Sequence, residues 1–517
     1  MTRAPRLDDS LTTSVDEASA VTYDYVVVGA GGTCSAFLQA LHERNRGSRP
    51  PRVLVLEQGP VLLGTHAQNL GAAHQPIMSS AAAAPWRSEG ELEVVAQVPY
   101  VGGRTLVWSG SVPRPTRAQL SSWPTATVEG LEDEWAWAEE LLGVRRAPEL
   151  GPEYRGSLQR DVRALLVDAT RSVPGLLPVQ DPSELDAPLA YPSRAGGGFE
   201  KFSGARTVLG LVANPYLDVA LVTGCEVIGL DVVDGEVRAV RTTSGELPVN
   251  GAVVVLATGS TEATRIVLAS GLPGTDRTVG RNLSGNTASF LTCRVPRSRF
   301  PGTSRDELEL AAFYVDGATA DREYHVHVSA CASPDPARDV ETVFRLLPDV
   351  FGDGALRRLV DADHVTFLVH GLCEVHAPGM DDDGGRLELD EDTLVGRFVL
   401  DEGDREAWTA MDRATDSVLD AIGGGGPVEL WDAATASWTQ GDVPRRMPFA
   451  FHETGTLWMG EDPDRSVTDP DGKVHGVSGL YVLGGSTFPA RSSWNPFLTM
   501  VALAGRLASV LTERSWE

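Results

Sequence analysis

Lysine is nearly missing from this sequence of 517 residues, in which only Lys201 and Lys473 occur. Basic residues number 44 against 71 acidic ones, so the formal net charge at pH 7 is −27. Nucleic acids and anionic membrane surfaces are bound through basic patches, so the composition argues against both kinds of partner. It is compatible with a cationic or neutral substrate, but it favours a charge that is spread over the surface and only keeps the protein soluble.

Cysteine and long apolar runs are also scarce. The five cysteines are widely spaced and form no C-x-x-C pair, which predicts reduced thiols and neither a disulfide framework nor a metal site. No apolar run approaches the ~18 residues of a membrane helix. The first residues lack the apolar core of a secretory signal. We therefore expect a soluble, cytoplasmic protein in which residues 1–22 form a polar tail.

The stretch YDYVVVGAGGTCSAF near the start indicates a strand, a tight glycine turn and a helix. Gly29 and Gly31 occupy the first two positions of the G-x-G-x-x-G dinucleotide-binding pattern, and Cys34 replaces the third glycine. The first glycine makes the turn, and the second lets the backbone approach a pyrophosphate at the helix N-terminus. The third allows close helix packing, so a small cysteine weakens the motif without removing its phosphate-binding part.

A second strand, RVLVLEQG, ends in Glu57. A carboxylate at this strand end can accept hydrogen bonds from both hydroxyls of a ribose. The strand, the glycine turn, the helix and the acid together predict a dinucleotide site. These residues alone leave FAD and NAD undecided.

Later segments extend the same pattern and suggest two domains. Short apolar strands that end in glycine recur in GAVVVLATGS and GLYVLGGSTFPA, whereas the middle of the chain has long alternating strands and an acidic helix. We expect an α/β, Rossmann-like domain with a mixed sheet and helices on both faces, into which an α+β substrate domain with an antiparallel sheet is inserted. The predicted ranges are 23–119, 205–286 and 441–517 for the first domain, and 120–204 and 287–440 for the second.

Three further stretches carry a family resemblance. They are VGGRTLVWSGSVPRP (101–115), FHETGTLWMG (451–460) and DPDGKVHGVSGLYVLGGSTFPARSSWNPFLTM (469–500). With the glycine turn, they occur in the order seen in the glucose–methanol–choline (GMC) oxidoreductases. The sequence resembles this flavoprotein family, in the motif style of its glucose oxidase and pyranose oxidase-like members. The resemblance covers roughly the first domain and extends too weakly into the second to assign substrate residues.

The resemblance implies that FAD is the cofactor. It assigns Glu57 to the adenosine ribose and the backbone of Val227 to the adenine. The residues implied along the pyrophosphate and the flavin ring are Gly29, Gly31, Gly32, Gly102, Gly103, Thr105 and Gly485.

Several positions depart from the family pattern. Trp108 stands where many members have asparagine, and Gly484 where many have aspartate. Members with covalently attached flavin have histidine at the position of Val107. Because valine cannot form that bond, we expect FAD to be bound noncovalently.

The resemblance also implies the catalytic pair. His452, in H-x-x-G-T, corresponds to the histidine above the flavin, and Asn495, in W-N-P, to its partner. An imidazole can accept the hydroxyl proton of an alcohol near neutral pH, while an amide holds the same oxygen. We expect oxidation of an alcohol, on a sugar, glycoside, nucleoside or related polyol, with dioxygen or another electron acceptor. The alternative is a lyase of the same fold whose FAD is redox-silent.

The sequence gives weaker evidence for functional roles of the remaining histidines and tryptophans. His325 and His327 share one strand face, but without a third ligand we interpret them, and His370, as structural histidines of a sheet. Trp108, Trp458 and Trp494 could border the substrate site or fill the core.

Overall fold

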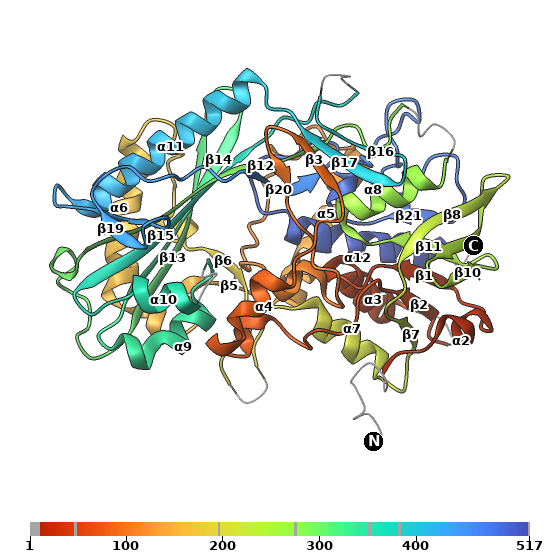
Figure 1. The fold of residues 1–517 in the computed structure, drawn as a ribbon, viewed down its shortest axis with the longest axis horizontal. Coiled ribbons are helices and arrows are strands. Elements are labelled where there is room, and N and C mark those ends of the chain that lie inside the picture. Colours follow the sequence, from red (N-terminus) through yellow and green to blue (C-terminus); the bar gives the residue numbers. More distant parts are fainter. Residues whose placement is uncertain are drawn as a thin grey trace.

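The computed structural model of the chain describes residues 11–45, 49–194, 197–272, 277–349, 353–380 and 384–514. Figure 1 shows two lobes side by side, one built around a parallel sheet and one around a long antiparallel sheet. Both ends of the described chain belong to the parallel-sheet lobe.

The parallel sheet has five strands, which all run in the same direction. Their short runs of valine and leucine are buried on both faces, as is typical of strands in a covered parallel sheet. In sheet order they are β21 (Leu480–Val482), β11 (Val253–Leu256), β1 (Tyr25–Val28), β2 (Arg52–Leu56) and β7 (Asp218–Val222).

Different layers cover the two faces of this sheet. Four helices pack on one face: α3 (Gly32–Arg44), α5 (Thr125–Leu142), α7 (Gly204–Val212) and α12 (Phe497–Arg514). The other face packs against α8 (Gly259–Ala269) and a three-stranded antiparallel sheet of β8 (Val227–Val233), β9 (Glu236–Thr242) and β10 (Gly245–Pro248).

The antiparallel sheet of the second lobe contains eight strands. They are β4 (Glu93–Val94), β12 (Ser284–Pro296), β13 (Glu309–Ala318), β14 (Glu323–Ala332), β15 (His364–Glu374), β18 (Glu429–Asp432), β19 (Ser437–Thr439) and β20 (Phe449–Thr454). Alternate side chains point to opposite faces of a sheet, so one face packs apolar residues against α6 (Ser157–Ser172) and α11 (Glu402–Gly423). The other face is turned toward the parallel-sheet lobe.

Smaller elements connect and cover these layers. They are α2 (Val15–Ser19), α4 (Gln75–Ser80), α9 (Pro336–Leu346), α10 (Asp353–Leu359), β3 (Arg87–Gly90), β5 (Val144–Arg146), β6 (Pro188–Ala190), β16 (Arg386–Asp390) and β17 (Thr393–Phe398). The 3₁₀ helices are η1 (Ala67–Asn69), η2 (Ala72–His74), η3 (Gly103–Leu106), η4 (Ala147–Glu149), η5 (Pro152–Arg155), η6 (Pro182–Leu185), η7 (Arg297–Arg299) and η8 (Gly485–Thr487).

The predicted fold class is confirmed, with two differences of detail. The antiparallel strands of residues 227–248 form a separate sheet on one face, so the five-stranded sheet itself is parallel rather than mixed. Within the predicted polar tail, Ser14 caps α2 and Ala18 is buried, so this part packs on the domain; residues 1–10 lie outside the described ranges.

The division of the chain into domains stays a prediction. Helix α5 falls in the range that we assigned to the substrate domain, yet its apolar residues, such as Leu131 and Trp135, pack in the core that contains α12. Helix α6, from the same range, packs against β13 of the antiparallel sheet. Among the described helices, none is both long and apolar enough to cross a bilayer.

Candidate active site

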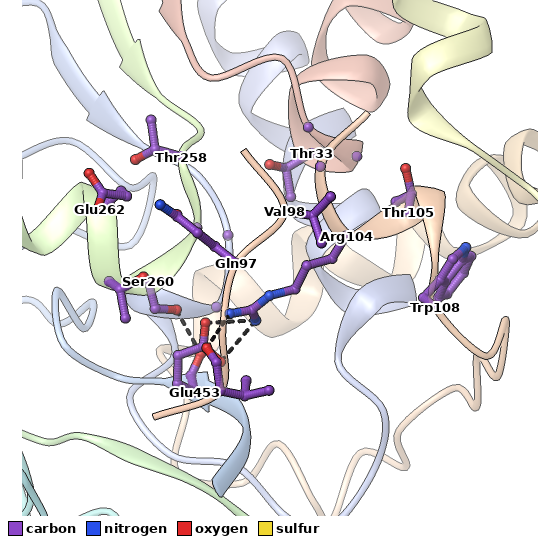
Figure 2. A pocket seen from close by; sticks show the side chains of 18 of the residues that line it. Thr33, Gln97, Val98, Arg104, Thr105, Trp108, Thr258, Ser260, Glu262 and Glu453 are labelled. Atoms are coloured by element: carbon purple, nitrogen blue, oxygen red, sulfur yellow. Dashed lines mark hydrogen bonds and ion pairs between the residues drawn. The ribbon is translucent and has the colours of Figure 1, made fainter. Parts of the chain in front are cut away.

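A cavity of about 610 Å³ extends from the carboxyl ends of the parallel strands to the inner face of the antiparallel sheet. At one end it is bordered by the glycine turn, Glu57 and the start of α8, and at the other by side chains from β12, β14, β15 and β20. Figure 2 shows polar side chains of different segments around it, among them Thr258, Glu262, Gln97 and Arg104. We call the two parts the cofactor end and the substrate end.

The three glycines of the turn have different physical roles. Gly29 has a φ of 91°, and a Cβ there would lie 2.8 Å from the carbonyl oxygen of Ala257, so only glycine fits. A Cβ on Gly31 would meet nothing within 4 Å, because this residue faces the cavity. Gly32 also borders the cavity, but its Cβ would lie 2.5 Å from the ring of Phe497. Close packing therefore requires Gly32, and space for a ligand requires Gly31.

Cys34 takes up the third glycine position without opening the helix packing. Its side chain is fully buried in the core beneath α3. Burial raises the pKa of its thiol, so the thiolate is disfavoured and the residue behaves as a small core side chain.

Glu57 lies at the end of β2, where its buried carboxylate organises the glycine turn. Its two oxygens accept hydrogen bonds from the backbone N–H groups of Ala30 (2.8 Å) and Gly59 (3.1 Å). Burial raises the pKa of this carboxyl group, and the backbone donors oppose that shift. Each carboxylate oxygen keeps a second lone pair, so ribose hydroxyls can still be accepted.

The segment after the turn lies directly against it. Gly103 borders the cavity, and its Cβ would lie 3.3 Å from the Cα of Gly31. Gly102 has a φ of 101° and donates its N–H to the carbonyl of Ala30 at 2.8 Å. The hydroxyl of Thr105 donates to the carbonyl of Gly102 and accepts from the N–H of Gly204, so it is already engaged within the protein.

The remaining predicted cofactor residues lie at opposite ends of the cavity. Val227 begins β8 at the cofactor end, where its carbonyl accepts a hydrogen bond of 2.7 Å from Arg265. Gly485 also borders the cavity, and its Cβ would lie 2.7 Å from the methyl of Met500. At Gly484, φ is 120° and the Cβ position is open.

Three helices begin at the cavity: α3, α8 and α12. Their first N–H groups have no intrahelical acceptor, and the helix dipole makes these ends positive. Thr258, just before α8, has a buried hydroxyl without a partner in the described part of the protein. The converging N-termini and unused donors fit a long ligand with an anionic pyrophosphate, as FAD would be.

His452 is positioned by an irregularity in β20. Its φ of 57° lies in the left-handed region, and the pairing of β20 with β12 shifts register at this point. Such bulges turn a side chain away from the strand alternation. Nδ1 of His452 lies 2.8 Å from Oδ1 of Asn286, and an amide oxygen can only accept, so Nδ1 carries the proton. Nε2 is then left as an acceptor.

Burial and nearby cations keep this imidazole neutral. Burial, then the charges of Arg491 and Arg104, lower the pKa of His452 well below 6.5. Arg491 also donates to the carbonyl of His452 at 2.9 Å, and Arg104 pairs with buried Glu453, the next residue along the chain, at 2.7 Å. The Arg104–Glu453 pair is visible beside the cavity in Figure 2.

Asn495 lies just before α12, on the same cavity as His452. Its side chain is buried, and the amide oxygen has no hydrogen-bond partner among the residues that the structure describes. A buried amide with unused capacity favours a ligand contact over a purely structural role.

Sequence reasoning missed several residues at the substrate end. Asn286, Phe290, His327, His370 and Asp349 were not proposed, although His327 and His370 had been noted as structural. Of the three tryptophans that the sequence analysis named, Trp108 borders the cavity, whereas Trp458 and Trp494 are buried in the core. The available signal was the alternation of polar and aromatic residues on the inner face of β12, β14 and β15. Among the described residues, no group of three or more His, Cys, Asp and Glu could hold a metal ion.

Comparison with known proteins agrees with this geometry. A family profile described as GMC oxidoreductase matches residues 383–504. A C-glycoside 3-oxidase of Microbacterium trichothecenolyticum is 26% identical over 93% of this chain and 95% of its own length. The C-terminal part of the chain therefore matches the GMC oxidoreductase family, and this relative is similar to nearly the whole chain. A pyranose 2-oxidase of Tricholoma matsutake is 24% identical, with coverage of 96% and 95%.

The fold of this chain also occurs in a solved structure. The crystal structure of pyridoxine 4-oxidase from Mesorbium loti aligns with a TM-score of 0.59 over 95% of this chain and 99% of that chain, at 16% identity. The match to the GMC oxidoreductase family implies a flavoprotein that uses FAD and oxidises alcohol groups. The open position beside Gly31 and the partnerless hydroxyl of Thr258 fit that cofactor.

Proposed function

We propose that this protein oxidises a secondary or primary alcohol of a sugar, glycoside or related polyol to a carbonyl, with His452 as the general base. The arrangement of His452, Asn286 and Asn495 at one end of the cavity carries this proposal. The C-glycoside 3-oxidase and the pyranose 2-oxidase, whose lengths this chain matches, support a sugar or glycoside as substrate and dioxygen as acceptor.

The residues of the chain divide the work of alcohol oxidation. Asn286 holds the proton on Nδ1 of His452, so Nε2 is free to take the hydroxyl proton of the substrate. Asn495 binds the same oxygen and stabilises the negative charge that develops on it. Together they hold the reacting C–H bond in one orientation. When bound, FAD supplies the hydride acceptor.

The cofactor would be held by the residues of the cofactor end: the turn of Gly29 and Gly31, Glu57, and the starts of α8 and α12. We infer that it is held without a covalent bond, because Val107 borders the cavity where a histidine would be needed. Precipitation with acid should leave the yellow flavin in the supernatant. Flavin that remains with the pellet would contradict this inference.

Anaerobic mixing of the FAD-loaded protein with sugars, glycosides and nucleosides tests the proposed reaction. We expect the flavin absorbance to bleach with at least one neutral sugar or glycoside, and to return when air is admitted. If such compounds bind without bleaching the flavin, alcohol oxidation is wrong and a redox-silent lyase becomes the better explanation.

A further inference from the structure

Four rings form a row across the inner face of the antiparallel sheet. Tyr314 of β13 is paired in register with His327 of β14, His327 with His370 of β15, and His370 with Phe290 of β12. Phe290 stacks on His370 with ring centres 4.2 Å apart. His327, His370 and Phe290 border the substrate end of the cavity. We call these four residues the aromatic row.

Asp349 lies against the two imidazoles of the row. Its carboxylate oxygens lie 3.5 Å from Nδ1 of His327 and 3.9 Å from Nδ1 of His370. Ser329, two residues after His327 on the same strand face, donates its hydroxyl to Asp349 at 3.3 Å. A carboxylate facing Nδ1 favours the proton on that nitrogen, so Nε2 of His327 is left for another partner.

Nearby basic groups partly offset the charge of Asp349, among them Lys201, whose pKa burial lowers to about 7. Fully buried Lys201 donates to the carbonyl of Pro348, next to Asp349, at 3.2 Å and to the side chain of Gln68 at 2.6 Å. Burial alone would raise the pKa of Asp349, but His327, His370 and Lys201 hold it well below its usual range. Arg104 and Glu453 form a balanced ion pair on the cavity. The substrate end therefore presents little net charge to a ligand.

Nε2 of His327 is buried and has no hydrogen-bond partner in the described part of the chain. Buried polar atoms are almost always satisfied, so a partnerless one beside a cavity points to a missing ligand group. We propose that His327, oriented by Asp349, binds a second hydroxyl of the substrate while the reacting hydroxyl lies at His452. His327 is then a specificity-determining residue that favours neutral polyols over monohydric alcohols.

A hydroxyl suits this position because it can both donate and accept, and so pairs with an imidazole whichever way its protons are placed. His327 and His452 belong to one site, since both side chains border the same cavity. The role of His327 rests on the proposed function, because the reacting hydroxyl is assigned there to His452.

His325 provides a matched control. It lies two residues before His327 on the same strand, and its ring stacks 4.3 Å from that of Tyr314. Like His327 it is buried, and neither of its ring nitrogens has a partner among the described residues, but it does not border the cavity. His325 also stacks on His327, with ring centres 4.9 Å apart, and phenylalanine keeps a ring in that position. His325→Phe therefore tests the effect of removing an imidazole beside His327 while His327 and the lining of the cavity are kept.

The experiment compares ligand binding and flavin reduction in four proteins: wild type, His327→Phe, His327→Gln and His325→Phe. The probes are methyl β-D-glucopyranoside and its monodeoxy analogues, titrated anaerobically while the flavin spectrum is followed. We expect the wild type to bind one deoxy analogue ~5- to 100-fold more weakly than the parent, the range for leaving a buried polar group unpaired. His327→Phe should bind the parent with the same loss and no longer distinguish that analogue. His327→Gln should recover part of the affinity, and His325→Phe should match the wild type.

Each outcome decides a separate question. Discrimination that survives in a folded, FAD-loaded His327→Phe protein, or the same loss in His325→Phe, overturns the role of His327. Failure of every probe to bind the wild type also overturns it. If the probes bind with the expected pattern but the flavin is never reduced, the polyol site stands and the proposed oxidation fails. Thermal melts and flavin content show whether His327→Phe has folded. If it has not, the binding of the analogues by His327→Gln decides whether His327 has the proposed role.

Discussion

The two ends of the cavity are built by different means. The cofactor end consists of backbone: strand ends, a glycine turn and helix N-termini, with Glu57 holding the turn from β2. The substrate end consists of side chains that come from several strands of the antiparallel sheet, such as Phe290, His327 and His370. Such backbone geometry is formed by contiguous residues, so the cofactor end can be recognised in the sequence from its motifs. The substrate end depends on the register between strands that are distant in the sequence. Its side chains can therefore change while the fold is kept.

The largest effect should come from His452, the proposed base at the substrate end. His452→Ala should bind FAD with a normal visible spectrum but reduce the flavin ~100- to 10,000-fold more slowly, as expected for loss of a general base. Stopped-flow reduction beside thermal melts measures both properties. A well-folded variant with a near wild-type rate would place the base elsewhere.

Asn495→Ala is the companion variant, with an expected loss of ~10- to 1,000-fold because one oriented polar group is removed. The double variant should lose less than the product of the two single effects, since both residues act on one oxygen. Independent, fully additive losses would separate Asn495 from the reacting hydroxyl.

A substitution at the cofactor end should weaken the binding of FAD rather than slow the reduction of the flavin. Glu57→Ala removes a charged acceptor of ribose hydroxyls, a loss of about 2–3 kcal/mol or roughly 30- to 150-fold in the dissociation constant of FAD. The N–H of Ala30 also loses its partner, so the melting temperature of the apoprotein should fall as well. An unchanged FAD affinity, measured by titration of the apoprotein, would exclude the ribose role.

Gly31 and Gly32 are neighbours with different expected roles: Gly31 leaves space for the cofactor, and Gly32 allows close packing against Phe497. In Gly31→Ala the new methyl enters the cavity, so FAD affinity should fall by about 1–3 kcal/mol while the apoprotein melts normally. In Gly32→Ala the methyl meets the ring of Phe497, so the free energy of unfolding of the apoprotein itself should fall by about 1–3 kcal/mol. Equal effects of the two substitutions on apoprotein melting would contradict this division.

The pH dependence should show the smallest effect in the wild type. The imidazole of His452 accepts a proton only when neutral, and its pKa is lowered well below 6.5 by burial and by Arg491 and Arg104. The reduction rate should therefore stay level as the pH falls through 6.5 and decline only below it. Arg104→Met removes a positive charge, so the decline should move to higher pH. A wild-type rate that already falls above pH 6.5 would contradict the neutral imidazole.

Most of the residues that the sequence predicts for the cofactor end border the cavity, because its motifs are local, whereas Gly102 does not border it. Gly29, Gly31, Glu57 and Gly103 all border the cavity as expected, and their roles remain proposals. The separate meander of β8, β9 and β10 could not be distinguished from strands of the main sheet, because alternation and turn signals look alike in both. The packing of α5 on α12 was hidden for a similar reason: an apolar helix face does not reveal its partner.

By itself the sequence determined the fold class and the glycine turn, because each depends on short contiguous patterns, and its family resemblance predicted that His452 and Asn495 act together. Only the tertiary structure showed that Asn286 selects the tautomer of His452, and that Asp349 lies between His327 and His370. These contacts join residues far apart in the chain through strand register and loop placement. Neither property is encoded in any local stretch, so the substrate end could be found only in the folded protein.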